Sequence, residues 1–99
     1  MILTYIKWRD ATHDPDDWID IDKADRLYPS TVHTVGFVLD EAKDFITLAQ
    51  SVAVPNVANT LSSVCSRWTI PKENIIERKE FPEYEIDPEE RIEHEYKEK

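Results

Sequence analysis

Glycine and sulfur are nearly absent from this sequence. Its 99 residues include one glycine, Gly36, one cysteine and one methionine. Phosphate-binding loops, dinucleotide-binding fingerprints and EF-hand calcium loops all need glycine where the backbone turns sharply or approaches phosphate. We therefore expect none of the usual nucleotide-dependent enzymes, and no cofactor.

The single cysteine, Cys65, also fits a protein of a reducing compartment. The chain has no apolar run long enough to span a bilayer and does not open on a basic and apolar leader. These features predict a cytoplasmic protein that does not bind membranes.

Basic residues are outnumbered, 12 against 21 acidic ones, which gives a net charge of −9. General affinity for nucleic acid requires clustered Lys and Arg, so it is not expected. Residues 82–99 alone carry eight acidic and three basic side chains, more than half of the net charge. We therefore divide the chain into a domain over residues 1–81 and an acidic tail over residues 82–99.

Alternation of apolar and polar residues predicts a mainly β protein. The expected strands cover residues 2–10, 31–39, 45–54, 64–70 and 75–81, with a bend or bulge at Gly36 and one tight turn over residues 71–74. Strands in this order favour a small five-stranded antiparallel barrel of the SH3 or Sm type. A domain of this length buries a thin core, which favours a homo-oligomer.

Three short helical pieces are also expected. Asp14-Pro15-Asp16-Asp17 has the composition of a helix start, and a short helix or turn with Trp18 and Ile19 should follow. A second piece, capped by Asp20 or Asp22, should reach Leu27. A third can begin at Asp87-Pro88 and cover residues 88–97.

Several short motifs resemble a group of small bacteriophage and prophage proteins. They are Trp8-Arg9-Asp10-Ala11, Trp18, Val35 to Glu41, Leu48 to Ser51, and Trp68 to Pro71 ahead of Ile75-Ile76. The resemblance covers roughly residues 2–80, and it rests on the order and spacing of the motifs. Such proteins are similar in organisation to Sm-like barrels, whose subunits often form rings. The resemblance implies a phage protein acting in the cytoplasm of a host cell.

No set of residues has the spacing of a catalytic or metal site, so neither is expected. Trp8 and Trp68 lie on the apolar phases of their strands, which predicts core positions, whereas Trp18 has a better chance of lining a pocket. Isolated cations near aromatic residues are typical of anion-binding sites. The candidate ligand-binding residues are Arg9, Trp18, Arg26, Tyr28, His33, Arg67 and Lys72, with Asn74 added because Lys72-Glu73-Asn74 lies where Sm-like proteins place a ligand loop.

Together these features predict a non-enzymatic, oligomeric binding protein that sequesters a small anionic host molecule, most simply a nucleotide-derived immune signal, as a phage counter-defence. Two alternatives stay open. The acidic tail could make the protein an inhibitor that binds a basic host protein. The Sm-like organisation could instead indicate an RNA-binding ring.

Overall fold

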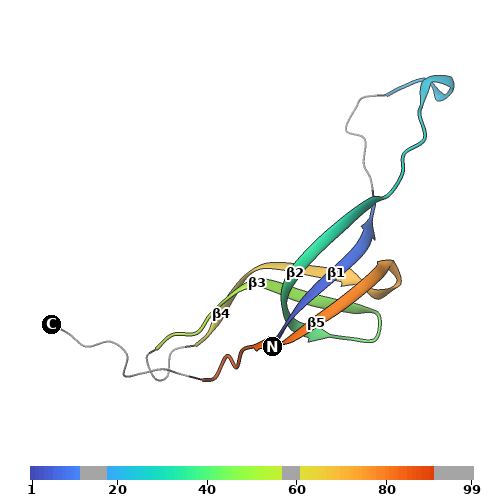
Figure 1. The fold of residues 1–99 in the computed structure, drawn as a ribbon. Helices are drawn as coiled ribbons and strands as arrows, with labels where there is room; N and C mark the ends of the chain where they lie inside the picture. Colours follow the sequence, from blue (N-terminus) through green and yellow to red (C-terminus); the bar gives the residue numbers. More distant parts are fainter. Residues whose placement is uncertain (12–17, 57–60, 91–99) are drawn as a thin grey trace.

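The computed structural model describes residues 1–11, 18–56 and 61–90. Within them the chain forms five strands and two single-turn 3-10 helices (Figure 1). The elements are β1 (Ile2–Asp10), η1 (Ile21–Lys23), β2 (Ser30–Glu41), β3 (Phe45–Ala53), β4 (Ser63–Pro71), η2 (Lys72–Asn74) and β5 (Ile75–Glu85).

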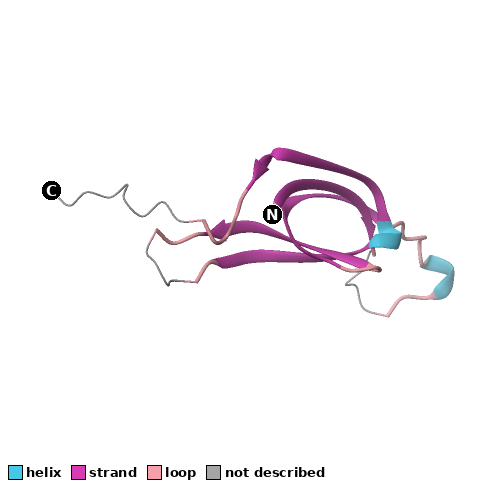
Figure 2. Cartoon of the chain, turned by 90° about the horizontal axis from the view of Figure 1, so that it is seen from below, coloured by secondary structure: helices cyan, strands magenta, loops and turns pink. Residues whose placement is uncertain are grey.

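The strands form one antiparallel sheet in the order β4-β3-β2-β1-β5. Neighbours in sequence pair from β1 to β4, and β5 returns to pair with β1. Figure 2 shows the strands curving strongly around one side of the sheet. The predicted set of five antiparallel strands is confirmed, and β4 and β5 are the two edges.

The concave side of the sheet holds the core, because alternate residues of each strand point inward. Ile6, Ile46, Leu48 and Ile70 are fully buried there. Trp8 is buried too, and its indole Nε1 donates a hydrogen bond of 3.0 Å to Thr34 Oγ1. The predicted core position of Trp8 is therefore confirmed.

Trp68 lies opposite Trp8 across this concave side. The two ring centroids are 6.3 Å apart with an edge-to-face geometry, although β2 and β3 separate their strands in the sheet. Trp68 remains 41% exposed, so the prediction that it is a core residue is confirmed only in part. The contact requires a sheet curved enough for β1 and β4 to face each other.

The irregularity predicted at Gly36 lies further along β2. The register with β3 shifts between Val38 and Asp40, which leaves Leu39 as the extra residue. Gly36 has a different role, since a Cβ built there would lie 2.9 Å from the Ala49 carbonyl oxygen and 3.0 Å from the Leu48 Cβ. The missing side chain lets β2 approach β3 closely.

The connection from β1 to β2 departs most from the expected helices. The predicted helix start at Asp14 to Asp17 lies outside the described residues. Trp18 to Asp20 has no regular structure, so the helix or turn expected there is wrong, and η1 ends at Lys23 instead of Leu27. Every described residue from Ala11 to Pro29 is exposed, so no buried face supports a longer helix. Its described part, residues 18–29, extends away from the sheet (Figure 1).

The end of the described chain also differs from expectation. β5 continues to Glu85, so the predicted domain boundary at residue 82 falls inside a strand. The Met1 amino group donates to the Ile86 carbonyl at 2.8 Å, and the Ile86 amide donates to the Met1 carbonyl at 2.9 Å. A helix is predicted over residues 88–97, but Pro88 and Glu89 form a turn and Glu90 has no regular structure. Residues 91–97 of this prediction lie outside the described residues.

None of the described segments is a helix with the length and apolar character needed to cross a membrane.

Candidate ligand-binding groove

The outer face of β3 and β4 carries three facing pairs of residues. Because Ile46, Leu48 and Ile70 point into the core, the residues between them point outward. The antiparallel register pairs Phe45 with Pro71, Thr47 with Thr69 and Ala49 with Arg67. An aromatic ring, two hydroxyls and a guanidinium are thus arranged in order along one face.

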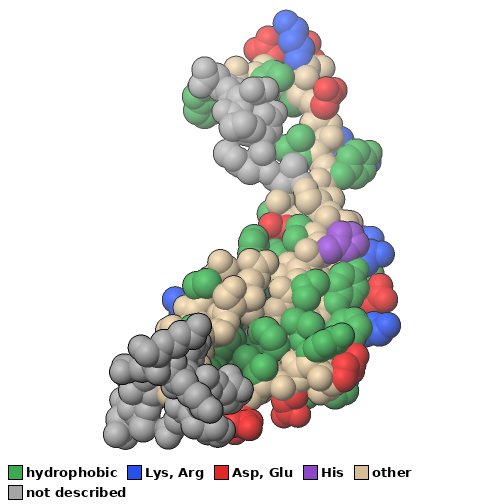
Figure 3. Space-filling model, turned by 60° about the vertical axis from the view of Figure 1, so that its left-hand side comes forward, with side chains coloured by type: hydrophobic (Ala, Val, Ile, Leu, Met, Phe, Trp, Pro, Cys, Tyr) green, Lys and Arg blue, Asp and Glu red, His purple; other side chains and the backbone are tan. Residues whose placement is uncertain are grey.

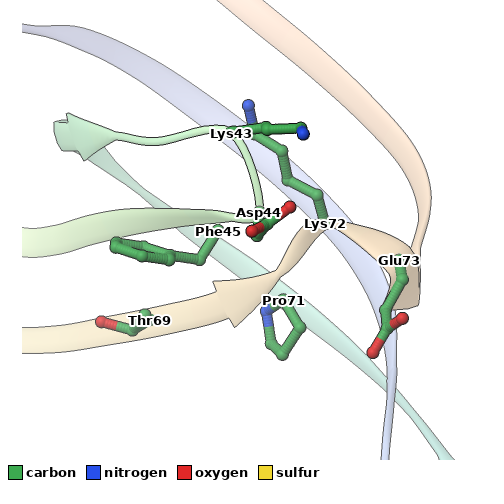
Figure 4. Close-up of a pocket in the computed structure, with 7 residues that line it drawn as sticks. All are labelled: Lys43, Asp44, Phe45, Thr69, Pro71, Lys72 and Glu73. Atoms are coloured by element: carbon green, nitrogen blue, oxygen red, sulfur yellow. The ribbon is translucent and has the colours of Figure 1, made fainter.

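A hollow of about 530 Å³ lies at the end of this face nearest η2. Its lining residues are Lys43, Asp44, Phe45, Thr69, Pro71, Lys72 and Glu73 (Figure 4). The turn from β2 to β3 supplies Lys43 and Asp44, and η2 supplies Lys72. The Lys72 amide donates a hydrogen bond of 2.8 Å to the Asp44 carbonyl, which joins the two connections. The volume falls within the range usual for small-molecule sites.

A second hollow, of about 630 Å³, adjoins the first and shares Thr69 with it. Its lining residues are Thr47, Val64, Cys65, Ser66, Arg67 and Thr69. The hydroxyls of Thr47 and Thr69 are 2.9 Å apart and hydrogen-bonded where the two hollows meet. We call the combined hollow the β3–β4 groove.

The charges of the groove are unevenly distributed. In the hollow nearest η2, Lys43 and Lys72 are offset by Asp44 and Glu73. In the second hollow Arg67 is the single charged lining residue, and it makes no ion pair within the described part of the chain. The Arg67 end is therefore the part of the groove best suited to an anion.

The backbone next to Arg67 is unusual. Ser66 has a φ of 56°, which is uncommon for a residue other than glycine. It lies where the pairing with β3 passes from Arg67 to Cys65, in the middle of β4. A strained residue in the wall of a groove is more often found at functional sites than elsewhere.

A cluster of charged groups fixes η2 beside the groove. Glu41, at the end of β2, accepts hydrogen bonds of 3.0 and 2.9 Å from Arg78 of β5 and forms an ion pair of 2.8 Å with Lys72. Hydrogen bonds from Arg78 and Lys72 lower the pKa of Glu41 from 4.5 to about 2. The hydrogen bond to Glu41 is the main cause that raises the pKa of Arg78, and Glu80 adds to it. Lys72 is therefore engaged at the groove wall, whereas Lys43 has no ion-pair partner among the described residues.

The predicted ligand-binding residues do not gather at one place. Arg67 and Lys72 line the groove, and Asn74 lies in η2 without lining it. Arg9 and His33 lie on the outer face of β1 and β2, where His33 stacks on Tyr5 with ring centroids 5.9 Å apart. The other three, Trp18, Arg26 and Tyr28, lie in the connection from β1 to β2.

Sequence reasoning missed Lys43, Phe45, Thr47 and Thr69. Thr47 and Thr69 alternate with the apolar residues Ile46, Leu48 and Ile70 along their strands, and this alternation predicts that the two threonines face outward. Phe45 is the first residue of the strand expected over residues 45–54, where the alternation of apolar and polar residues does not mark it as a binding residue. In the structure it is 40% exposed. Its position on the polar phase was the available signal.

The groove offers recognition chemistry. Its lining residues provide a guanidinium, ammonium groups, hydroxyls and a phenyl ring, and they contain no histidine that could serve as a base for Cys65. Over the described ranges, no group of three His, Cys, Asp or Glu residues converges as a metal site. These side chains can hold a ligand by charge, hydrogen bonding and stacking.

Comparisons of this chain with protein-family models, with curated proteins and with solved structures found no match. The resemblance to small phage proteins therefore stays a prediction.

Proposed function

We propose that this protein is a non-enzymatic binding protein whose β3–β4 groove holds a small phosphorylated ligand with a flat ring, of the nucleotide class. One observation carries the proposal: Arg67, which forms no ion pair with a described residue, shares one groove with the hydroxyls of Thr47 and Thr69 and with the exposed ring of Phe45.

Each part of the groove suits one part of such a ligand. The Arg67 guanidinium matches a phosphate group, to which it can donate two parallel hydrogen bonds. The threonine hydroxyls can donate to and accept from sugar oxygens. The Phe45 ring provides a stacking surface for a base.

The spacing of these groups agrees with a ligand of that size. Residues two apart on one face of a strand are about 6.8 Å apart, so the positions of Arg67 and Phe45 differ by about 14 Å along the strands. Both side chains can extend toward the Thr47–Thr69 pair between them. A nucleotide or a small cyclic dinucleotide fits this interval.

A closed SH3-like or Sm-like barrel is the finer fold that we propose for the support of the groove. Two contacts favour it: the edge-to-face packing of Trp8 on Trp68, and the bridge from Glu41 of β2 to Arg78 of β5 across the intervening β1. Closure would hold β3 and β4 rigidly, which lowers the entropic cost of binding.

The biological role that we propose is capture without conversion. A phage protein that sequesters a nucleotide-derived immune signal in the host cytoplasm would need a groove of this chemistry and no catalytic group. The resemblance in the sequence motivates this role, and self-association would multiply the number of grooves per particle.

Isothermal titration calorimetry tests the proposed function. The ligands are cyclic dinucleotides, cyclic ADP-ribose isomers and adenosine monophosphate. Inorganic phosphate and adenosine, the two parts of the last ligand, are titrated separately. We expect binding of at least one intact nucleotide, and Arg67→Gln should weaken it at least about tenfold, the loss expected for a charged hydrogen-bonding partner. Phe45→Leu should weaken binding of adenosine more than binding of phosphate.

The matched control is Arg9→Gln, which removes an exposed arginine from the outer face of β1, outside the groove. The proposed function is wrong if no nucleotide binds, or if Arg9→Gln weakens binding as much as Arg67→Gln does.

The two alternative functions stay predictions. An inhibitor that uses its acidic tail should lose its partners when residues 87–99, with six acidic against three basic side chains, are removed, which leaves β5 complete. An RNA-binding ring should shift short uridine-rich or adenine-rich RNA, and this shift should weaken as salt rises.

A further inference from the structure

Residues 18–29, the described part of the connection between β1 and β2, carry large apolar side chains that are exposed. Trp18 is fully exposed, Ile21 is 94% exposed and Leu27 is 51% exposed. Apolar side chains of this size, concentrated on one projecting segment, mark a surface that another molecule covers. We call this segment the β1–β2 arm.

A second apolar surface lies on the outer face of the sheet. Leu3 of β1 is paired with Phe37 of β2 on one side and with Phe81 of β5 on the other. Tyr5, in the next outward position, is paired with Val35, which is 48% exposed. We call these five residues the outer patch. Figure 3 shows apolar side chains gathered on this side of the sheet, next to the histidine.

The charges around the two surfaces are opposite in sign. The described residues of the arm hold three aspartates, Asp20, Asp22 and Asp25, against Lys23 and Arg26. The outer patch is bordered on the same face by Lys7, Lys79 and Arg9, against Glu77. An acidic apolar segment and an apolar patch with a basic border are complementary.

The described arm of one chain does not cover the outer patch of the same chain. The arm leaves the sheet at Asp10 and Ser30, the far ends of β1 and β2 from Leu3, and it extends away from the strands (Figure 1). All its described residues are exposed, so none of them covers the patch of its own chain.

We propose that the β1–β2 arm of one copy docks on the outer patch of a second copy, and that the exchange is reciprocal. A tryptophan buries about 150–250 Å², and Ile21 and Leu27 add smaller areas on each arm. Reciprocal docking doubles this area and covers a matching area on both patches, which brings the total toward the range of stable dimers, about 1,200–2,000 Å².

The inference goes beyond the proposed function, because the outer patch lies on β1, β2 and β5 while the β3–β4 groove lies on β3 and β4. Phe37 of the patch is paired with Ala49, so the two surfaces adjoin on the outer face, but no residue of the patch lines the groove. The test of docking can therefore fail while the test of ligand binding succeeds, and the reverse also holds.

Sedimentation velocity and native mass spectrometry on the full chain test the docking. We expect a dimer at about 100 µM protein, a concentration that reveals even weak association. Trp18→Asp and Val35→Asp should each weaken the dimer at least about tenfold, since each places an uncompensated charge in the contact. Leu61→Asp is the matched control, because Leu61 is 87% exposed and belongs to neither surface.

Mixing the two variants identifies the contact. A Trp18→Asp chain keeps a working patch and a Val35→Asp chain keeps a working arm, so the mixture restores one of the two docking contacts and should form a heterodimer, weaker than the unmodified dimer, that neither variant forms alone. The proposal is wrong if the unmodified chain is monomeric, if Leu61→Asp disrupts the dimer equally, or if the mixture associates no more tightly than either variant alone, because arm-to-arm or patch-to-patch contacts cannot be restored by mixing.

Discussion

At the scale of single residues, Glu41 connects three parts of the chain that the sequence keeps far apart. It ends β2, and it contacts Lys72 of η2 and Arg78 of β5. Its side chain is 37% exposed, so water screens these ion pairs and each contributes only about 0.2–1 kcal/mol. The value of the cluster therefore lies mainly in fixing η2 at the end of the groove.

The cluster predicts a dependence of stability on acid pH. Because the pKa of Glu41 falls from 4.5 to about 2 on folding, its carboxylate stabilises the folded state above pH 4.5, and this contribution is lost as the pH falls toward 2. Glu41→Gln should lower the free energy of unfolding by about 1 kcal/mol at pH 7 and flatten its decline between pH 4.5 and 2. Urea denaturation across this pH range measures both effects.

Asp40→Asn is the control for this prediction. Asp40 is the exposed neighbour of Glu41 and has no ion pair within the described ranges. Equal pH profiles for the two variants would contradict the role given to Glu41.

Gly36 gives a second prediction at this scale. A Cβ at residue 36 would lie 2.9 Å from the Ala49 carbonyl oxygen, a backbone atom that cannot move aside alone. Gly36→Ala should therefore destabilise the fold by about 1–3 kcal/mol, as overpacking of a close contact does. Thermal unfolding of this variant beside Ala53→Gly, which removes a Cβ from an exposed site on β3, would show whether crowding is the cause.

At the scale of elements, the strands were predictable because each buries one face. Ile6, Trp8, Ile46, Leu48 and Ile70 all recur at alternate positions, and all are buried. The short helices were not predictable from capping patterns, because a cap stabilises a helix only where other contacts also favour it. In the connection from β1 to β2 the described residues have no such contacts, and η1 is a single turn without a side-chain cap.

The groove was only half predictable. Arg67 and Lys72 could be predicted as ligand-binding residues because basic side chains near aromatic residues can be identified from the sequence alone. Their relation to Phe45 could not, since it depends on the register of β3 with β4, in which Phe45 faces Pro71 and Ala49 faces Arg67. A slip of one residue would turn every one of these side chains to the other face.

Trp68 supplies a prediction at the element scale. Its ring packs edge-to-face on Trp8 from the opposite side of the curved sheet. Trp68→Ala should destabilise the fold by about 2 kcal/mol, less than the loss of a fully buried tryptophan, because part of the ring is already in water. Chemical denaturation measures this loss. Trp18→Ala, measured in dilute solution, should leave stability unchanged, and an equal loss for both would contradict the packing role of Trp68.

At the scale of the whole molecule, large apolar side chains are exposed in several separate places on the described surface. The arm, the outer patch and the groove lie on different parts of the chain, and β4 and β5 are the outer strands of the sheet. Pro82 in β5 removes one backbone donor from an edge strand, which limits uncontrolled pairing there. The molecule is thus suited to association through defined surfaces.

Removal of the arm separates the two proposals. Asp10 and Ser30 face each other in the register, so an Asn-Gly turn can join β1 to β2 in place of residues 11–29. We expect this shortened chain to fold, to bind nucleotide with unchanged affinity and to be monomeric in sedimentation velocity. A shortened chain that loses nucleotide binding would place the arm in the site, contrary to the assignment of the groove.

The most direct test of the central claim, that the β3–β4 groove binds a phosphorylated ligand, is a titration of the isotope-labelled full chain with a nucleotide, followed by amide chemical shifts in NMR spectra. We expect the largest shifts on Phe45, Thr47, Arg67 and Thr69, and we expect inorganic phosphate alone to shift the Arg67 end. Shifts confined to the arm or the outer patch, or no shifts at millimolar nucleotide, would contradict this claim.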